Sequence, residues 1–276
     1  MSLMTSERAG SDAADDDDDD DAVAVAGASV ASRLFAVIDA FTTPTAAQSL
    51  TLTAIAERAG LPLSTTHRLV AEWITWGGIS KLADGRYSLG LKLWELGVQT
   101  PTARNLRTIA LPYLEDLYEV AHQHVHLAIL DGQEALYLEK LSGHGAVPIV
   151  SRVGARLPLH ATGVGLVLLA HSTAAFLDEY LSRPLAQLLP ATVTSPEQLR
   201  KRLAEIRAIG VARMREEMTA GSSSLAAPVL DRSGRVVGAV SIVFPTSVDW
   251  DPAQEDAVRS AARGISRSLG YRRSVS

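Results

Sequence analysis

Cysteine is absent from all 276 residues of this chain, and that absence removes several kinds of chemistry at once. No disulfide can form, no thiolate can hold a metal ion, and no cysteine can act as a nucleophile. Long apolar runs are also missing, because charged or polar residues interrupt every stretch approaching the ~18 residues needed to span a bilayer. The N-terminus lacks the basic-then-apolar layout of a signal peptide. We therefore expect a cytoplasmic protein with no membrane partner.

Signatures of enzyme chemistry are missing as well. The sequence holds no P-loop, no dinucleotide-binding fingerprint and no Gly-x-Ser-x-Gly elbow. The serine run Ser222–Ser224 has no nearby His–Asp pair that would support a nucleophile. We therefore expect no catalytic residues and no cofactor.

The first hundred residues carry a helical pattern followed by a hairpin signal. Apolar residues recur at i, i+3, i+4 and i+7 over 34–41, which is one helix face. Thr51 is a typical N-cap for a second helix that stops at Gly60, and a third helix opens at Pro62. The Asp-Gly pair at 84–85 lies between two short apolar runs and predicts a hairpin. This order of elements is that of a winged helix-turn-helix.

The third helix carries residue types that suit DNA recognition. Small hydroxyl side chains in its first turn and a half can contact phosphates without blocking close approach, and a helix N-terminus favours an anion. Arg68 can contact a phosphate or a guanine edge. Two structural alternatives stay open, since Ser64 can simply cap the helix and Arg68 can pair with Glu72 at i+4.

Arg86 lies at the tip of the expected hairpin, where it either contacts DNA as a wing residue or only keeps the turn soluble. Residues 29–100 hold six Lys and Arg against five Asp and Glu, so this region is barely basic. Few DNA contacts per subunit favour a dimer that uses two half-sites. The expected DNA-contacting residues are Ser32, Arg33, Thr51, Ser64, Thr65, Thr66, His67, Arg68 and Arg86.

Most of the negative charge lies at the N-terminus. The chain carries a net −5, yet residues 1–21 hold nine acidic side chains against one arginine, which leaves +3 for the rest. The seven consecutive aspartates Asp15–Asp21 repel one another and include nothing apolar to bury, so we expect a disordered acidic tail over 1–28. It is either a solubilising tail or an arm that mimics phosphate and competes with DNA for a basic surface.

The second half of the chain is predicted to combine helices with antiparallel strands. Its apolar periodicity and turn signals predict an α+β domain and not a doubly wound sheet. The expected helices are 106–121, 164–170, 173–180, 196–209 and 252–269, and the expected strands are 125–130, 135–140, 147–153, 225–230 and 236–244.

Four separated motifs resemble the IclR family of bacterial regulators. Residues 52–69 resemble its helix-turn-helix, and 85–90 resemble its wing and the entry to its linker helix. Residues 156–165 and 226–229 resemble two signatures of its effector domain. The resemblance runs from about residue 29 to 270.

The resemblance implies a domain plan and a set of partners. A disordered acidic tail (1–28) would precede a winged helix-turn-helix domain (29–90), a linker helix used in dimerisation (91–105) and a GAF-like effector-binding domain (106–271). Family members are typically homodimers or dimers of dimers that bind double-stranded operator DNA and respond to a small-molecule effector, often an organic acid. Either repression or activation of transcription is compatible with the family.

The sequence Gly163-Val164-Gly165 enters a helix, and on its own it reads either as a backbone anion site or as a tight structural turn. The resemblance favours a ligand role. Leu166 stands where the family usually has Lys, and Met214 stands at a commonly acidic position. Both departures favour a larger, more apolar organic acid as effector. The residues that the resemblance carries over to the site are Val147, Val150, Gly163, Val164, Gly165, Met214, Ser222, Ser224 and Ser241.

Three further alternatives stay open on the sequence. His122, His124 and His126 alternate and would share one face of a strand, as metal ligands or as core-edge histidines. The second domain could serve only to oligomerise a DNA-binding protein that senses nothing. The chain could also be a GAF-fold enzyme fused to a nucleic-acid-binding module.

Overall fold

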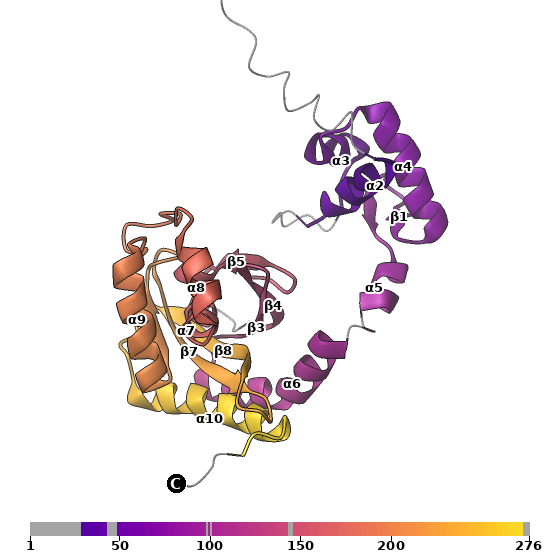
Figure 1. The fold of residues 1–276 in the computed structure, drawn as a ribbon. Coiled ribbons are helices and arrows are strands. Elements are labelled where there is room, and N and C mark those ends of the chain that lie inside the picture. Colours follow the sequence, from indigo (N-terminus) through magenta and orange to yellow (C-terminus); the bar gives the residue numbers. More distant parts are fainter. Residues whose placement is uncertain (1–28, 43–48, 98, 100, 143–145, 273–276) are drawn as a thin grey trace, which may run out of the picture. The chain divides into compact units, whose positions relative to one another are not determined.

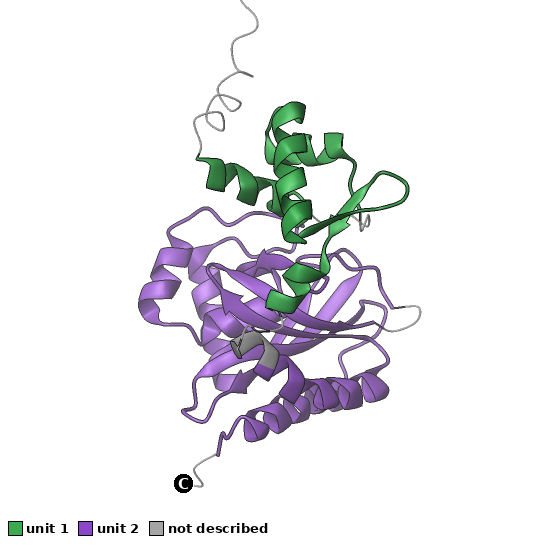
Figure 2. Cartoon of the chain, turned by 90° about the vertical axis from the view of Figure 1, so that its right-hand side faces the viewer, with its two compact units in different colours: residues 1–97 green, residues 98–276 purple. Residues whose placement is uncertain are grey.

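The computed structural model describes residues 29–42, 49–97, 99, 101–142 and 146–272. The chain divides into two compact units, residues 1–97 and 98–276, which are coloured separately in Figure 2. Each unit is considered by itself below. No helix in the described ranges is long and apolar enough to cross a membrane. The expected N-terminal tail, 1–28, lies outside the described residues.

Unit 1 has the predicted winged helix-turn-helix architecture. Its helices pack around a small core that includes Val37, Ile55, Leu69 and Ile79. The two strands pair antiparallel, and Leu50 adds an isolated bridge to Tyr87 of the hairpin. The elements, with the labels of Figure 1, are α2 (Val30–Asp39), α3 (Leu52–Ala59), α4 (Leu63–Trp76), β1 (Ile79–Lys81), β2 (Tyr87–Leu89) and α5 (Leu91–Gly97).

Local sequence signals fix the turn between α3 and α4. The Thr51 hydroxyl accepts the backbone N–H of Ala54, as expected of an N-cap. Gly60 ends α3 with φ 62°, a left-handed conformation that favours glycine. Leu61 then turns into the core, where it is 7% exposed. Removing its side chain from water helps to hold the two helices at a fixed angle.

Unit 2 is built on one antiparallel sheet of six strands in the order β5-β4-β3-β8-β7-β6. Figure 1 shows helices covering both faces of this curled sheet. The strands are β3 (His124–Asp131), β4 (Glu134–Leu141), β5 (Arg156–Pro158), β6 (Ala212–Arg215), β7 (Ser222–Leu230) and β8 (Val236–Pro245). The helices are α6 (Pro101–Ala121), α7 (Gly163–Ala170), α8 (Ala174–Leu181), α9 (Pro196–Ile209) and α10 (Pro252–Ser268), with a short 3-10 turn at Leu159–Ala161.

Two apolar cores lie on opposite faces of the sheet. One forms where α7, α8 and α9 cover it, and the other forms under α6 and α10. Helix α7 is apolar on every side, and each of its residues is buried. A helix without a polar face must be enclosed, so its N-terminus is delivered into the protein interior. This places the start of α7, at Thr162 and Gly163, beside the middle of the sheet.

Three sequence expectations about elements need correction. The segment 147–153 is not a strand, because the carbonyls of Val147 and Ser151 accept hydrogen bonds from the side chains of His124 and Lys140. Strands β5 and β6 were not anticipated from the sequence, since they have only three and four residues. The expected linker helix over 91–105 is not continuous: α5 ends at Gly97 and a second helix, α6, begins at Pro101 and runs on to Ala121.

Candidate functional site

The exposed start of α4 is the first candidate site. Ser64, His67 and Arg68 are exposed, and Thr65 is half-buried. Pro62 precedes the helix without any side-chain cap, so the backbone N–H groups of the first turn are not satisfied by a capping side chain. The capping alternative for Ser64 is therefore wrong. This end of the helix can offer N–H groups and polar side chains to an anion together.

Two expected DNA contacts on α4 fare differently in the structure. Thr66 is fully buried and its hydroxyl donates to the carbonyl of Pro62. It therefore belongs to the core, and the prediction that it contacts DNA is wrong. Arg68 forms no ion pair with Glu72 among the described residues, which leaves its guanidinium on the surface. The alternation of exposure follows the 3.6-residue period of the helix, since Thr66 falls on the face with Leu69 and Val70.

Some of the remaining residues that we expect to contact DNA already form hydrogen bonds within the protein. The Arg86 guanidinium donates to the hydroxyl and the carbonyl of Ser49, at 2.9 Å and 2.6 Å. These bonds tie the hairpin to the chain that enters α3. Ser32, on α2, is exposed, and its backbone N–H donates to the side chain of Ser29. Thr51 is exposed as well, although its hydroxyl is occupied by the cap of α3.

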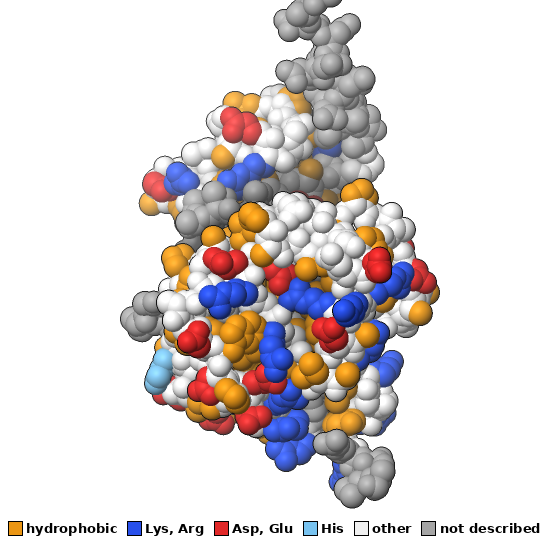
Figure 3. All heavy atoms as spheres, turned by 90° about the vertical axis from the view of Figure 1, so that its left-hand side faces the viewer, with side chains coloured by type: hydrophobic (Ala, Val, Ile, Leu, Met, Phe, Trp, Pro, Cys, Tyr) orange, Lys and Arg blue, Asp and Glu red, His pale blue; other side chains and the backbone are white. Residues whose placement is uncertain are grey.

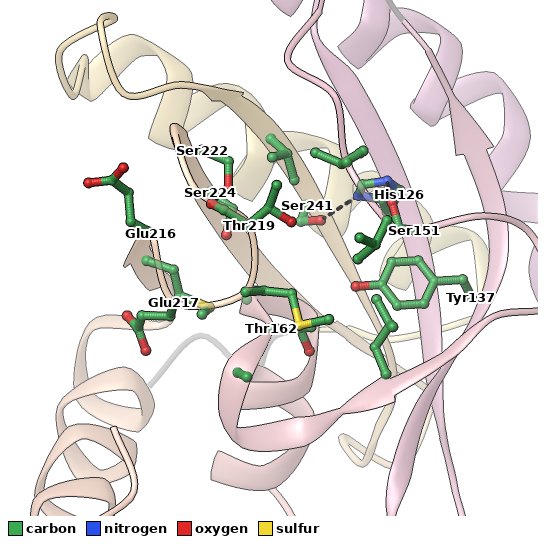
Figure 4. A pocket seen from close by; sticks show the side chains of 18 residues that line it. His126, Tyr137, Ser151, Thr162, Glu216, Glu217, Thr219, Ser222, Ser224 and Ser241 are labelled. Carbon is green, nitrogen blue, oxygen red and sulfur yellow. Dashed lines mark hydrogen bonds between the residues drawn. The ribbon is translucent and has the colours of Figure 1, made fainter. Parts of the chain in front are cut away.

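A cavity in unit 2 that opens to solvent is the second candidate site, with about 470 Å³ of space when its open mouth is included. Figure 4 shows side chains from the sheet, the N-terminus of α7 and the turn between β6 and β7 converging on it. Its wall also includes residues 149–151. The lining residues are His126, Tyr137, Ile149, Val150, Ser151, Leu157, Ala161, Thr162, Gly163, Met214, Glu216, Glu217, Met218, Thr219, Ser222, Ser224, Ser241 and Val243.

His126 is the most constrained polar residue of this cavity. Its Nε2 lies 2.8 Å from the Ser151 hydroxyl, and its Nδ1 lies 3.4 Å from the Ser241 hydroxyl (Figure 4). Burial lowers the pKa of His126 to about 3, and the positive charge of Lys140 acts in the same direction. The ring is therefore neutral at pH 7, with one donor and one acceptor nitrogen.

Tyr137 and Thr162 form a second polar pair at the cavity. Burial raises the pKa of Tyr137, and a hydrogen bond with Thr162 opposes that shift. The Thr162 hydroxyl donates to the carbonyl of Pro158 and accepts the N–H of Gly165. Thr162 is therefore the N-cap of α7 and also part of the cavity wall. The fold uses one residue to start the helix and to shape the site.

The charges at the cavity are acidic. Among the described residues that line it there is no Lys and no Arg. Glu217 is buried and paired with Arg202 at 2.6 Å. Glu216 is exposed, has φ 51°, and accepts the backbone N–H of Gly221 through its carboxylate. A second negative group on a ligand would thus meet like charge at this rim.

Six of the nine expected effector residues line the cavity: Val150, Gly163, Met214, Ser222, Ser224 and Ser241. The other three do not. The carbonyl of Val147 accepts from His124, Val164 is buried in α7, and the Gly165 N–H is taken by Thr162. Leu166 is also fully buried in the core, so only Met214 of the two family departures affects the cavity surface.

Sequence reasoning missed a group of lining residues, and for some of them a signal existed. Of the three alternating histidines, His122 precedes β3 with φ 50° and so does not share the predicted face, whereas the rings of His124 and His126 do, stacked with centroids 6.3 Å apart. Within the described ranges, no group of three or more His, Cys, Asp or Glu is positioned to hold a metal ion. The missed residues are His126, Tyr137, Ser151, Thr162, Glu216, Glu217 and Thr219.

A winged helix-turn-helix unit followed by an α+β unit is an arrangement typical of DNA-binding transcription regulators. A model described as the IclR helix-turn-helix domain matches residues 30–80. A model described as bacterial transcriptional regulator IclR C-terminal matches residues 98–267. The chain therefore belongs to the IclR family of DNA-binding transcriptional regulators, as the sequence motifs predicted.

Individual relatives agree with this assignment. The HTH-type transcriptional regulator XynR of Escherichia coli (strain K12) is 36% identical over 231 residues, which cover 82% of this chain and 91% of that protein. An IclR homolog from Microbacterium hydrocarbonoxydans, solved in complex with 4-hydroxybenzoate, is 37% identical with a TM-score of 0.81, covering 88% of this chain and 99% of that one. The IclR of Thermotoga maritima is 31% identical with a TM-score of 0.70, covering 87% and 98%.

Proposed function

We propose that the cavity of unit 2 binds a small organic acid with one carboxylate and a largely apolar body, and that this effector modulates operator binding by unit 1. The observation that carries the proposal is the division of the cavity wall into two kinds of surface. One part is apolar and includes Ile149, Val150, Leu157, Met214 and Val243. The other part is lined by hydroxyl groups.

A single carboxylate has a suitable place near the start of α7. Gly163 opens that helix and lines the cavity, and the helix N-terminus favours an anion. Ser224 lies on β7 beside it with a hydroxyl that can donate, whereas the Ser222 hydroxyl already donates to the carbonyl of Thr219. A bound carboxylate would be held by neutral donors, because no lysine or arginine lines the described part of the cavity. Glu216 and Glu217 disfavour a ligand with two carboxylates.

The likeness to the Microbacterium hydrocarbonoxydans homolog supports the same chemical class. Its bound 4-hydroxybenzoate has one carboxylate, an aromatic body and a distal hydroxyl. In this chain the neutral His126 and its serine partners offer both donor and acceptor atoms for such a hydroxyl. We therefore take hydroxylated aromatic monoacids as the first compounds to test.

The experiment compares two ligands of matched shape by thermal unfolding of the full chain. We expect 4-hydroxybenzoate to raise the melting temperature by a few degrees and terephthalate, which has a second carboxylate, to have no effect. Met214→Glu should abolish the shift, whereas Met214→Leu, a control of similar size, should retain it. Stabilisation by glyoxylate or pyruvate but by no apolar acid would overturn the proposal.

A gel-shift assay on the upstream intergenic DNA then tests whether the effector acts on DNA binding. We expect an effector that stabilises the protein to change the affinity for this DNA. An effector that stabilises the protein while the affinity stays constant would contradict the sensing role. It would favour a protein whose second unit only oligomerises.

We propose that the DNA-contacting surface is the exposed start of α4, with Ser64, Thr65, His67 and Arg68. We include in it exposed residues of α2, such as Ser32, which precedes Arg33.

We also propose that the protein acts as a homodimer. Helix α5 presents Leu91 and Trp94 at 77% and 67% exposure, an apolar surface that is typical of protein interfaces. The weak positive charge of residues 29–100 gives a second reason to combine two half-sites.

A further inference from the structure

A second groove lies in unit 2, away from the cavity described above. It runs between α10 and strand β7 and has about 1220 Å³ of open space. None of its lining residues lines the cavity. Its apolar surface comes from Ala227, Pro228, Leu230, Ala262 and Tyr271.

Arginine side chains border this groove. Arg259, Arg263 and Arg267 follow one another at intervals of four residues on α10, so they lie in a row along one side of the helix, and Arg272 follows the helix. Arg259 is paired with Glu255. Within the described residues, Arg263, Arg267 and Arg272 are exposed and have no carboxylate partner. Figure 3 shows Lys and Arg side chains from the middle to the bottom of one face, with Asp and Glu side chains among them.

The end of strand β7 that borders the groove has no strand beside it in the described residues, although the Leu230 N–H donates to the Ser266 hydroxyl of α10. Strand β6 pairs only with residues 223–226 of β7, so no described strand covers residues 227–230 on that side. Pro228 within this stretch is typical of a strand edge, since proline cannot donate to a ladder. Because Pro228 has no N–H and the Leu230 N–H is taken by Ser266, this edge offers few backbone donors, so recognition of a ligand here rests on the neighbouring guanidinium groups.

We propose that this α10 groove binds an extended acidic peptide, and that the aspartate run Asp15–Asp21 is the peptide that this protein supplies. Arginine clusters recognise acidic segments through charge-assisted, often bidentate hydrogen bonds. The three α10 arginines span about 12 Å along the helix, and seven extended residues span about 23 Å, so one run can reach all of them.

The test uses the full chain with Asp15–Asp21 changed to Asn, so that its own run does not compete. A fluorescein-labelled peptide of residues 10–24 is titrated in and followed by anisotropy. We expect binding at low salt that weakens as ionic strength rises. The double variant Arg263→Gln and Arg267→Gln should lower the affinity at least tenfold. The control Arg183→Gln and Arg200→Gln removes two exposed arginines elsewhere, each paired with a carboxylate, and should change nothing.

A second variant shows whether a loss of affinity comes from the missing arginines or from damage to the folding of α10. Arg272→Gln lies beyond the helix and should weaken the peptide by itself, severalfold. Equal affinity in all variants, or no binding at all, would overturn the proposal. So would a loss of binding caused by Arg68→Ala instead, which would assign the peptide to the DNA-binding unit. A change of oligomeric mass in the Arg263→Gln and Arg267→Gln variant, with unchanged peptide affinity, would assign the groove to contact between copies.

Discussion

Nε2 of His126 lies 2.8 Å from the hydroxyl of Ser151, and this contact joins strand β3 to the irregular segment that forms part of the cavity wall. The carbonyl of Ser151 also accepts the Lys140 ammonium at 2.8 Å. This segment is thus held to the sheet by hydrogen bonds from side chains, and not by the backbone hydrogen bonds that would hold a strand. The shape of this part of the cavity wall depends on this arrangement.

The buried His126 should make stability fall in acid. Its pKa is lowered to about 3 in the folded protein, whereas the unfolded value is about 6.5. Between these values the unfolded chain binds a proton that the folded chain does not, so the free energy of unfolding decreases as the pH falls through this window. One such group contributes at most about 1.4 kcal/mol per pH unit. His124, whose pKa is lowered by burial too, adds in the same direction.

Urea unfolding at pH 7, 6 and 5 measures this slope. We expect a shallower dependence on pH for His126→Gln than for the wild type. His67→Gln removes an exposed histidine and serves as the matched control. Equal slopes in the wild type and in His126→Gln would contradict the assignment of a neutral, buried ring.

The two glycines at the start of α7 should respond differently to alanine. A Cβ at Gly165 would lie 2.5 Å from the backbone of Leu159, which cannot move aside, so Gly165→Ala should cost about 1–3 kcal/mol of stability or more. A Cβ at Gly163 would lie 2.6 Å from the Ser224 hydroxyl, a side chain that can rotate, and 3.4 Å from the Cβ of Ala226, which is ordinary van der Waals contact. Gly163→Ala should therefore fold but lose the effector-dependent rise in melting temperature.

The double variant Gly163→Ala and Ser224→Ala provides the check, because it removes the atom that the new methyl group meets. We expect it to regain the stability of the wild type without the ligand-dependent shift in thermal unfolding, because Ser224 is itself a proposed donor to the carboxylate. If Gly163→Ala bound the effector as tightly as the wild type, the cavity would not be the effector site.

Arg68 and Arg86 should separate DNA binding from stability. Arg68→Ala removes an exposed side chain without a described ion-pair partner, so the melting temperature should stay constant while operator affinity falls at least tenfold in a gel-shift assay. Arg86→Ala removes two hydrogen bonds to Ser49 and should lower the stability of unit 1 by about 1.5–3 kcal/mol. Tight operator binding by Arg68→Ala would show that α4 is not the recognition helix.

Trp94 on α5 should matter for assembly. Trp94→Lys places a charge on the exposed apolar surface proposed for dimerisation, and we expect a lower average mass in sedimentation equilibrium. Val120→Lys replaces another apolar residue, 72% exposed on α6, and is the matched control. An unchanged mass for Trp94→Lys would move the dimer contact elsewhere.

The sequence alone determined the order of elements in unit 1 and the family. Signals such as the cap at Thr51 and the left-handed Gly60 act within a few residues, and the hairpin turn at 84–85 is equally local. These local signals do not depend on how distant parts of the chain fold. For the same reason the sequence assigned α7, whose apolar run and entry glycines are contiguous.

The tertiary structure decided which side chains meet. Ser241 and His126 are 115 residues apart in sequence, and only the pairing of β3 with β8 brings them to one cavity. The apolar run 147–153 has the alternation of a strand, yet the partners of its carbonyls are side chains of the sheet. Arg86 looked like a free wing residue because nothing in its neighbourhood predicts the hydrogen bonds to Ser49. Periodicity and caps depend on nearest neighbours, whereas burial and hydrogen-bond partners depend on packing between distant segments.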